Sequence, residues 1–344
     1  MKTPYSDAPQ HALWPRSVAL PDPMDVDPVV AAAFPIMAED RIATAGSCFA
    51  QHIARTLVAE GYNYLITEPG PADRQFGVFP ARFANIYTVR QLLQTFERAF
   101  GLREPEVGPW MRQGRIVDPF RPLVEPAGFD SVAAMEADRA RHMAAVREMF
   151  EQATVFIFTL GLTEGWRSGG GTVVPVATGV GGAVPAGDET FEYFNASVAE
   201  MTADLTAFID KLRILNPGVK IILTVSPVPL MATYEQRHVL VSTAYSKAAL
   251  RVVADEVCRA RERVAYFPSY EIVTGPHHGH RFLEDDLRNV RPEGVAHVMS
   301  LFKRHYLDGS TTAAPEAAPV TARRTAQDRE ALGAVICEEE LIDQ

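Results

Sequence analysis

"RIATAGSCFAQHIARTL" (residues 41–57) changes its hydrophobic pattern halfway along. Its first six residues form a short apolar run typical of a strand, and large apolar residues then recur at every fourth position from Phe49, as one face of a helix requires. The pattern predicts a strand that turns at Gly46 directly into a helix. Two side chains that could act as nucleophiles, Ser47 and Cys48, lie next to each other at this turn.

The same alternation of strand and helix patterns continues along the chain. Strands are predicted at "YNYLITE" (62–68), "ATVFIFTLG" (153–161), "VKIILTV" (219–225) and "VAYFPS" (264–269), with a long helix over 191–218. This rhythm is typical of an α/β protein with a parallel sheet and helices on both faces. In such sheets ligands bind at the carboxyl ends of the strands, which is where the Gly-Ser-Cys turn falls.

Composition narrows the class of protein. With 344 residues, 47% of them hydrophobic, the chain can bury a sizeable core, and a net charge of -10 offers no basic face for nucleic acid. No apolar run is long enough to span a membrane, so we expect a cytoplasmic protein.

The cysteines Cys48, Cys258 and Cys337 lie far apart, which predicts neither a disulfide framework nor a zinc site. The glycine-rich stretches "RSGGGTVV" and "TGVGGAVPAGD" lack the context of a phosphate-binding loop, and we expect no cofactor.

Three parts of the chain differ in character. Residues 1–39, rich in proline and aspartate, predict an irregular arm packed on the core. Residues 40–307 carry the alternating pattern and form one domain, with a helical insertion or lid at about 104–150. Residues 308–344 are low in large apolar side chains and predict a flexible tail with a short helix at its end.

Five segments together carry a family resemblance. In order along the chain they are "ATAGSCFAQHIARTL", "FTLGLTEGW", "LTVSPVPL", "AYSKAALR" and "YFPSYEI", and with them the chain resembles the bacterial GSCFA family, which is related to the SGNH/GDSL hydrolases. The resemblance implies a three-layer α/β/α sandwich with a flavodoxin-like parallel sheet. It implies the fold more firmly than it implies a substrate.

The resemblance also implies roles at the turn. SGNH enzymes carry a Gly-Asp-Ser turn after the first strand, and its serine is the nucleophile. That register places the nucleophile at Cys48 and leaves Ser47 as a helix cap, with Ser47 as the alternative nucleophile. A thiol suits this role, because the positive end of a helix dipole favours the thiolate.

Two further positions correspond to the oxyanion donors of SGNH enzymes. The resemblance assigns them to Gly77 and Thr163, although the usual asparagine is replaced by Thr163 and Glu164. The hydroxyl of Thr163 can still donate a hydrogen bond. Glu164 either supports the substrate site or forms a salt bridge.

The general base is the clearest departure from the pattern. Asp286 stands where the Asp-x-x-His motif is expected, but Asn289 replaces the histidine and cannot accept a proton at neutral pH. His238, in the loop after the strand at 219–225, is the first candidate for a replacement, and His52 lies one helical turn beyond the Gly-Ser-Cys turn. The "HHGH" run at 277–280 is too weak a signal to predict a metal site.

Two functions follow from these residues. The first is an acyl hydrolase (esterase) or acyltransferase that forms a covalent acyl intermediate at the Gly-Ser-Cys turn and acts on a small acyl or glycosyl substrate. The second is a non-catalytic protein that binds small molecules or acyl groups and has kept the fold but lost the base. The sequence leaves open hydrolysis against transfer, and also the oligomeric state.

Overall fold

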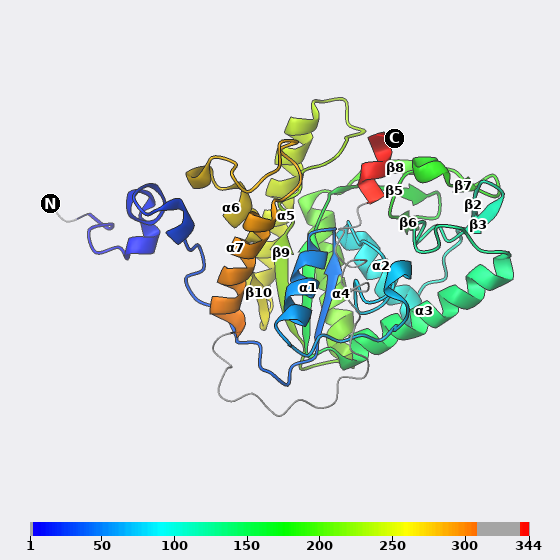
Figure 1. The fold of residues 1–344 in the computed structure, drawn as a ribbon, viewed down its shortest axis with the longest axis horizontal. Coiled ribbons are helices and arrows are strands. Elements are labelled where there is room, and N and C mark those ends of the chain that lie inside the picture. Colours follow the sequence, from blue (N-terminus) through cyan, green and yellow to red (C-terminus); the bar gives the residue numbers. More distant parts are fainter. Residues whose placement is uncertain (1–2, 308–337, 344) are drawn as a thin grey trace.

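A four-stranded parallel sheet lies at the centre of the computed structural model, which describes residues 3–307 and 338–343 (Figure 1). The strands follow the order β1-β4-β9-β10, and every neighbouring pair is parallel. Their bounds are β1 Ile42–Gly46, β4 Val155–Leu160, β9 Lys220–Val225 and β10 Val264–Tyr266. The predicted α/β class is confirmed.

Helices cover both faces of this sheet, as a three-layer α/β/α sandwich requires. Along β4, Phe156 and Phe158 face one layer, whereas Val155 and Ile157 face the other. The first layer consists of α2 (Val89–Ala99), α4 (Val198–Leu215) and α5 (Val239–Ala260), with α3 (Val132–Gln152) beside α2. The second consists of α1 (Ala50–Ala59), α6 (Ser269–Thr274) and α7 (Pro292–Phe302).

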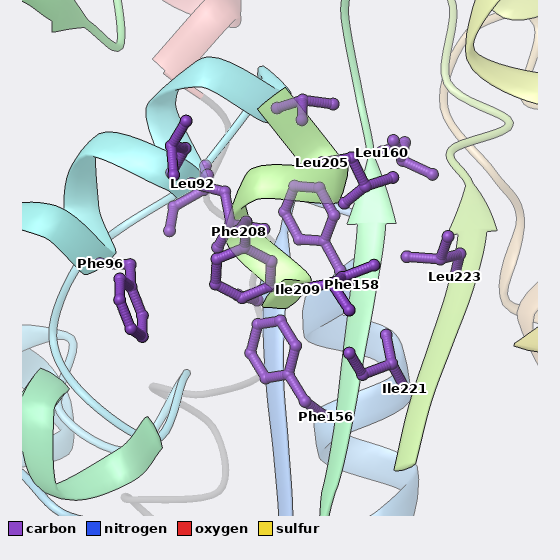
Figure 2. Close-up of a cluster of buried hydrophobic side chains, with 14 of the residues drawn as sticks. Leu92, Phe96, Phe156, Phe158, Leu160, Leu205, Phe208, Ile209, Ile221 and Leu223 are labelled. Carbon is purple, nitrogen blue, oxygen red and sulfur yellow. The ribbon is translucent and has the colours of Figure 1, made fainter. Parts of the chain in front are cut away.

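An aromatic cluster joins the first helical layer to the sheet (Figure 2). Phe208 of α4 lies with its ring centroid 5.7 Å from that of Phe156 and 5.8 Å from that of Phe96 in α2. Burying a phenylalanine side chain contributes roughly 1.5–3 kcal/mol. These rings therefore fix α2 and α4 on the strands whose carboxyl ends carry the site.

The predicted strand at 62–68 is wrong. Tyr64 makes a single isolated parallel bridge to Ile42, supported by hydrogen bonds from the Ile42 N–H to the Asn63 carbonyl (3.0 Å) and from the Leu65 N–H to the Ile42 carbonyl (2.9 Å). The chain turns away after this one pairing. Its side chains still pack on the edge of the sheet beside β1.

The long helix predicted over 191–218 begins later than expected. Its first residues form β8 (Phe191–Asn195), which pairs with β5 (Glu164–Ser168), and α4 starts at Val198. The start of α4 is fixed by a capping box, in which Ser197 and Glu200 bond each other's backbone N–H. Apolar residues on a half-buried strand thus continued the helical pattern by coincidence.

Two small antiparallel sheets lie beside the main sheet, on the side of α3 (Figure 1). One contains β2 (Trp110–Arg112), β3 (Arg115–Val117) and β7 (Val184–Pro185), and the other contains β5, β6 (Val173–Val174) and β8. The glycine-rich "RSGGGTVV" forms the β5–β6 hairpin. The segment 104–150 contains the β2–β3 hairpin and most of α3.

The two ends of the chain have separate courses. The N-terminal segment forms short helical turns and leaves Tyr5 and Trp14 exposed before Ile36 is buried, its N–H donating to the Tyr306 carbonyl (2.8 Å). Most of the predicted tail, 308–337, lies outside the described residues.

The remaining helices of the described residues are short. They are Gln10–Ala12, Pro15–Ala19, Pro23–Asp25, Ala72–Arg74, Val180–Gly182 (η5), Pro276–His278, Lys303–Leu307 and the C-terminal Glu338–Asp343 (η9). In the described ranges, no helix is both long and apolar enough to cross a membrane.

Candidate active site

The Gly-Ser-Cys turn is built against the end of β4. Gly46 has φ +138°, and a Cβ at this position would lie 2.4 Å from the Thr159 carbonyl oxygen. The next residue, Ser47, donates its backbone N–H to the same oxygen (3.2 Å). Because both the backbone conformation and the space exclude a side chain, only glycine fits where the strand ends.

Replacing Gly46 with alanine is expected to lower the free energy of unfolding by about 3 kcal/mol, because the backbone strain and the collision with β4 add together. Chemical denaturation measures this loss. Gly61→Ala is the matched control: Gly61 also has a positive φ, +78°, but nothing lies within 4 Å of the place that a Cβ would take, so we expect a loss of only about 1 kcal/mol. Equal losses in the two variants would contradict the tight contact at the turn.

Ser47 is not the helix cap that the sequence predicts. The N-cap of α1 is Phe49, without a side-chain cap, and the Ser47 hydroxyl is buried with no hydrogen-bond partner in the part of the chain that the structure describes. It packs against Gly161, where a Cβ would lie 2.9 Å from the Ser47 Cβ. Cys48 is 5% exposed and packs against Val228 and Val290.

A buried lysine faces this turn from helix α5. Lys247 is 1% exposed, and its Nζ donates to the Gly161 carbonyl at 2.8 Å. Burial lowers the pKa of Lys247 to about 8, while the negative charges of Glu339 and the Cys48 thiolate act in the opposite direction. The structure therefore pairs the cysteine electrostatically with an amine that is partly neutral near pH 8. This lysine is not among the site residues predicted from the sequence.

The segment just before α2 forms another wall of the site. Its Ile86 N–H donates to the Gly46 carbonyl (2.8 Å), which places the neighbouring Asn85 beside the turn. Asn85 is 1% exposed, and Gln51 of α1 donates to its Oδ1 (3.1 Å), so the amide group has a fixed orientation. Ala84 holds φ +60°, a conformation that favours glycine.

The predicted oxyanion donor Gly77 lies in a loop whose neighbouring residues line a small pocket. Its neighbours Gln75 and Val78 line that pocket together with Gln51 and Asn85. Gly77 itself has φ +77° and is half-buried. Its role in stabilising an oxyanion stays a prediction.

Thr163 and Glu164 follow β4, at the carboxyl edge of the sheet. The hydroxyl of Thr163 is fully buried and has no hydrogen-bond partner among residues 3–307 and 338–343. Glu164 accepts hydrogen bonds from the Thr233 hydroxyl (2.8 Å) and from the Tyr234 N–H (3.3 Å). Glu164 thus anchors the loop that leads from β9 to α5, while Thr163 keeps a donor available.

The loop residues predicted to supply or support a base are exposed in the structure. His238 is exposed at the N-cap of α5, where its Nδ1 accepts the Leu240 N–H (3.1 Å). Asp286 and Asn289 are exposed and bond each other through the Asn289 amide (2.8 Å). The same loop directs Arg288 and Val290 inward.

His52 lies on α1 with its ring centroid 5.5 Å from that of Phe49. Burial and the nearby Arg55 cation lower the pKa of His52 to about 4. Its ring is therefore neutral at physiological pH. A supporting role in the site stays a prediction.

The described residues contain no group of three or more His, Cys, Asp or Glu side chains that could hold a metal ion. In the "HHGH" run, His278 is buried and its Nε2–H donates to the Ile272 carbonyl (2.9 Å). This histidine stabilises the loop before α7.

The fold and the site define a class: an α/β/α protein with a cysteine at the first strand-to-helix turn of a parallel sheet. The chain belongs to the GSCFA family, whose family model matches residues 41–302. No curated protein sequence matches the chain. Among solved structures it is similar to the Clostridium thermocellum family 3 carbohydrate esterase, with a TM-score of 0.33 and 10% sequence identity, covering 77% of this chain and 94% of that one.

Proposed function

We propose that this protein is an acyl hydrolase (esterase) or an acyltransferase that works through a thioester on Cys48. The observation that carries this proposal is the buried Lys247, which lies in the electrostatic field of the cysteine and has a pKa lowered to about 8 by burial. A lysine of this kind serves as a general base in place of histidine. The chain thus has an alternative to the histidine that Asn289 replaces.

The reaction proceeds in two steps. Neutral Lys247 takes the proton of the Cys48 thiol as the sulfur attacks the carbonyl carbon of the substrate, and the resulting ammonium then protonates the leaving alcohol or amine. In the second step, Lys247 removes a proton from water or from an acceptor alcohol, which attacks the thioester and releases the thiol. The lysine ammonium then protonates the leaving thiolate, so that only the two steps together return the lysine and the cysteine to their starting states.

The negative oxygen of the tetrahedral intermediate needs oriented donors. The Asn85 side-chain amide supplies one, because Gln51 fixes its orientation. The Thr163 hydroxyl is the second, since it is buried and makes no other hydrogen bond within the described ranges. Thr163 follows β4, and Asn85 lies beside the Gly-Ser-Cys turn because the neighbouring Ile86 N–H donates to the Gly46 carbonyl.

Alkylation by iodoacetamide across a pH range tests the nucleophile. We expect mass spectrometry to find Cys48 modified, with an apparent pKa below the ordinary thiol value of about 8.5. Cys258 is the internal control, because burial raises its pKa to about 12 and should leave it unmodified at neutral pH. A Cys48 as inert as Cys258, both in the full chain and in a chain that ends at residue 337, would contradict the assignment.

The second candidate is a non-catalytic protein that binds a small acyl or glycosyl ligand. The observation that favours it is the loop before α7, which presents the aliphatic Val290 to Cys48 and pairs Asn289 with Asp286 at the surface. Saturable ligand binding by a protein with an inert Cys48 would support this function instead.

A further inference from the structure

The C-terminal helix η9 inserts a carboxylate into the pocket beside the Gly-Ser-Cys turn. Glu338 is fully buried, and its carboxylate accepts hydrogen bonds from the Tyr87 hydroxyl (2.6 Å) and from the Asn85 side-chain amide. The Glu338 N–H donates back to the Tyr87 hydroxyl (3.1 Å). A buried carboxylate is costly unless several donors compensate it, so this pocket is a built site for a negatively charged oxygen.

A second carboxylate enters from the same helix. Glu339 is 8% exposed and pairs with the buried Arg288, Nη2 to Oε2, at 3.4 Å. The negative charge of Glu339 raises the pKa of Lys247, and the Cys48 thiolate acts on Lys247 in the same direction. Two adjacent residues of η9 therefore reach both sides of the site, and Leu341 fixes the helix by packing on Gly181 of η5.

We propose that Glu338 and Glu339 occupy the active site as a built-in analogue of the acyl product, and that Arg288 is a subsite for an anionic group carried by the natural substrate. The Glu338 carboxylate takes the place of the carboxylate that ester hydrolysis releases, held by the Asn85 amide that would hold the oxyanion. The Glu339 carboxylate takes the place of a second negative group, next to the scissile bond. This inference rests on the function proposed above.

The charges around the pocket favour a substrate of this class. Two cations that are almost fully buried, Lys247 and Arg288, face it, and the acids of η9 supply the opposing charge. A neutral substrate that displaced those acids would break the buried ion pair of Arg288 with Glu339 without replacing it, which is unfavourable. An acyl compound with a carboxylate or phosphate group close to its carbonyl would restore the pairing.

The test compares two alkylating reagents that differ by one charge, iodoacetate and iodoacetamide, on the full chain and on a chain that ends at residue 337. Without η9, we expect Cys48 to react at least about tenfold faster with both reagents. We also expect the ratio of the iodoacetate rate to the iodoacetamide rate, relative to that of free N-acetylcysteine, to rise about tenfold. A full-length Glu338→Gln/Glu339→Gln variant provides the same comparison without shortening the chain.

Arg288→Gln in the shortened chain should remove most of the preference for iodoacetate. Arg291→Gln is the matched control, because Arg291 is three residues away and pairs with Asp285 at the surface (2.9 Å). A Cys48 that reacts readily but at the same rate with and without η9 would overturn the product analogue. A reactive Cys48 without any preference for iodoacetate would overturn the Arg288 subsite. In both cases the proposed acyl chemistry would stand.

A Cys48 that reacts with neither reagent would count against the proposed function itself, and the inference is then decided by binding. A fluorescent peptide with the sequence EEELIDQ should bind the shortened chain saturably, and Arg288→Gln should weaken it about tenfold. A peptide that does not bind would overturn the inference.

Discussion

Cys48→Ala is expected to lower the rate of hydrolysis of an activated ester, such as p-nitrophenyl acetate, by at least about 10³-fold. The reason is that the variant has no sulfur to form the thioester, while Lys247 and the Asn85 amide remain in place. Steady-state kinetics on the full chain measure the loss. A fall in kcat without a matching rise in KM would locate the effect in the chemical steps.

Two further variants make this result specific. Cys258→Ala removes the other described cysteine, which is half-buried on α5, and we expect it to keep the full rate. Ser47→Ala removes the neighbouring hydroxyl, and we expect it to lower the rate of hydrolysis less than Cys48→Ala does. A Cys48→Ala enzyme that retained most of its activity while Ser47→Ala lost it would show that the serine is the nucleophile.

Lys247→Met is expected to lower the rate by about 10²- to 10⁴-fold, the usual contribution of a general base. In the unmodified protein the rate should rise with pH through about 8, because burial lowers the pKa of Lys247 to that value and only the neutral amine accepts a proton. The variant should lack this rise. A pH series of kcat/KM over the same range measures both effects.

Lys220→Met is the matched control for the lysine. Lys220 begins β9 at the amino end of the sheet and pairs with Asp40 (2.8 Å), far along the strand from the carboxyl edge that bears the site. We expect this variant to keep the rise in rate near pH 8. An unchanged pH profile in Lys247→Met, with the fold intact by thermal unfolding, would refute the assignment of the base.

The sequence predicts the fold well because its central strands are buried on both faces. Segments such as "ATVFIFTLG" must be continuously apolar to pack between two helical layers, and this pattern is visible without a structure. Half-buried strands carry a weaker pattern. The apolar pattern therefore predicts a helix over Phe191–Asn195, which form a strand, and a full strand around Tyr64, which makes only one isolated bridge.

The site is less readable from the sequence. The turn at Gly46–Cys48 is local, so its glycine and its two nucleophiles can be identified from adjacent letters. Lys247 is about 200 residues away, within the motif "AYSKAALR", and only the helix geometry shows that it lies on the buried face with Ser246 and Leu250. A lysine at a position where the helical pattern of α5 predicts burial is the signal that could have identified Lys247 as a site residue. Lysine is rarely fully buried without a partner.

The inward position of Arg288 and the insertion of Glu338 depend on long-range packing. The Asp286 carboxylate accepts the backbone N–H groups of Arg288 and Asn289 (2.8 and 2.9 Å), and this turn directs the arginine inward and the asparagine outward. Nothing in the local pattern distinguishes these two directions. The sequence predicts a short helix at the acidic end of the chain, but the contact of that helix with Asn85 is visible only in the structure.

Direct capture of the acyl intermediate tests the central claim. The full chain, and the chain that ends at residue 337, would be mixed with p-nitrophenyl acetate, quenched in acid and digested for mass spectrometry. We expect one acetyl group on Cys48, formed together with a burst of nitrophenol and absent from the Lys247→Met variant at pH 7. Acetylation of Ser47 instead, or a protein that hydrolyses the ester without any acetyl group on Cys48, would contradict the thioester mechanism.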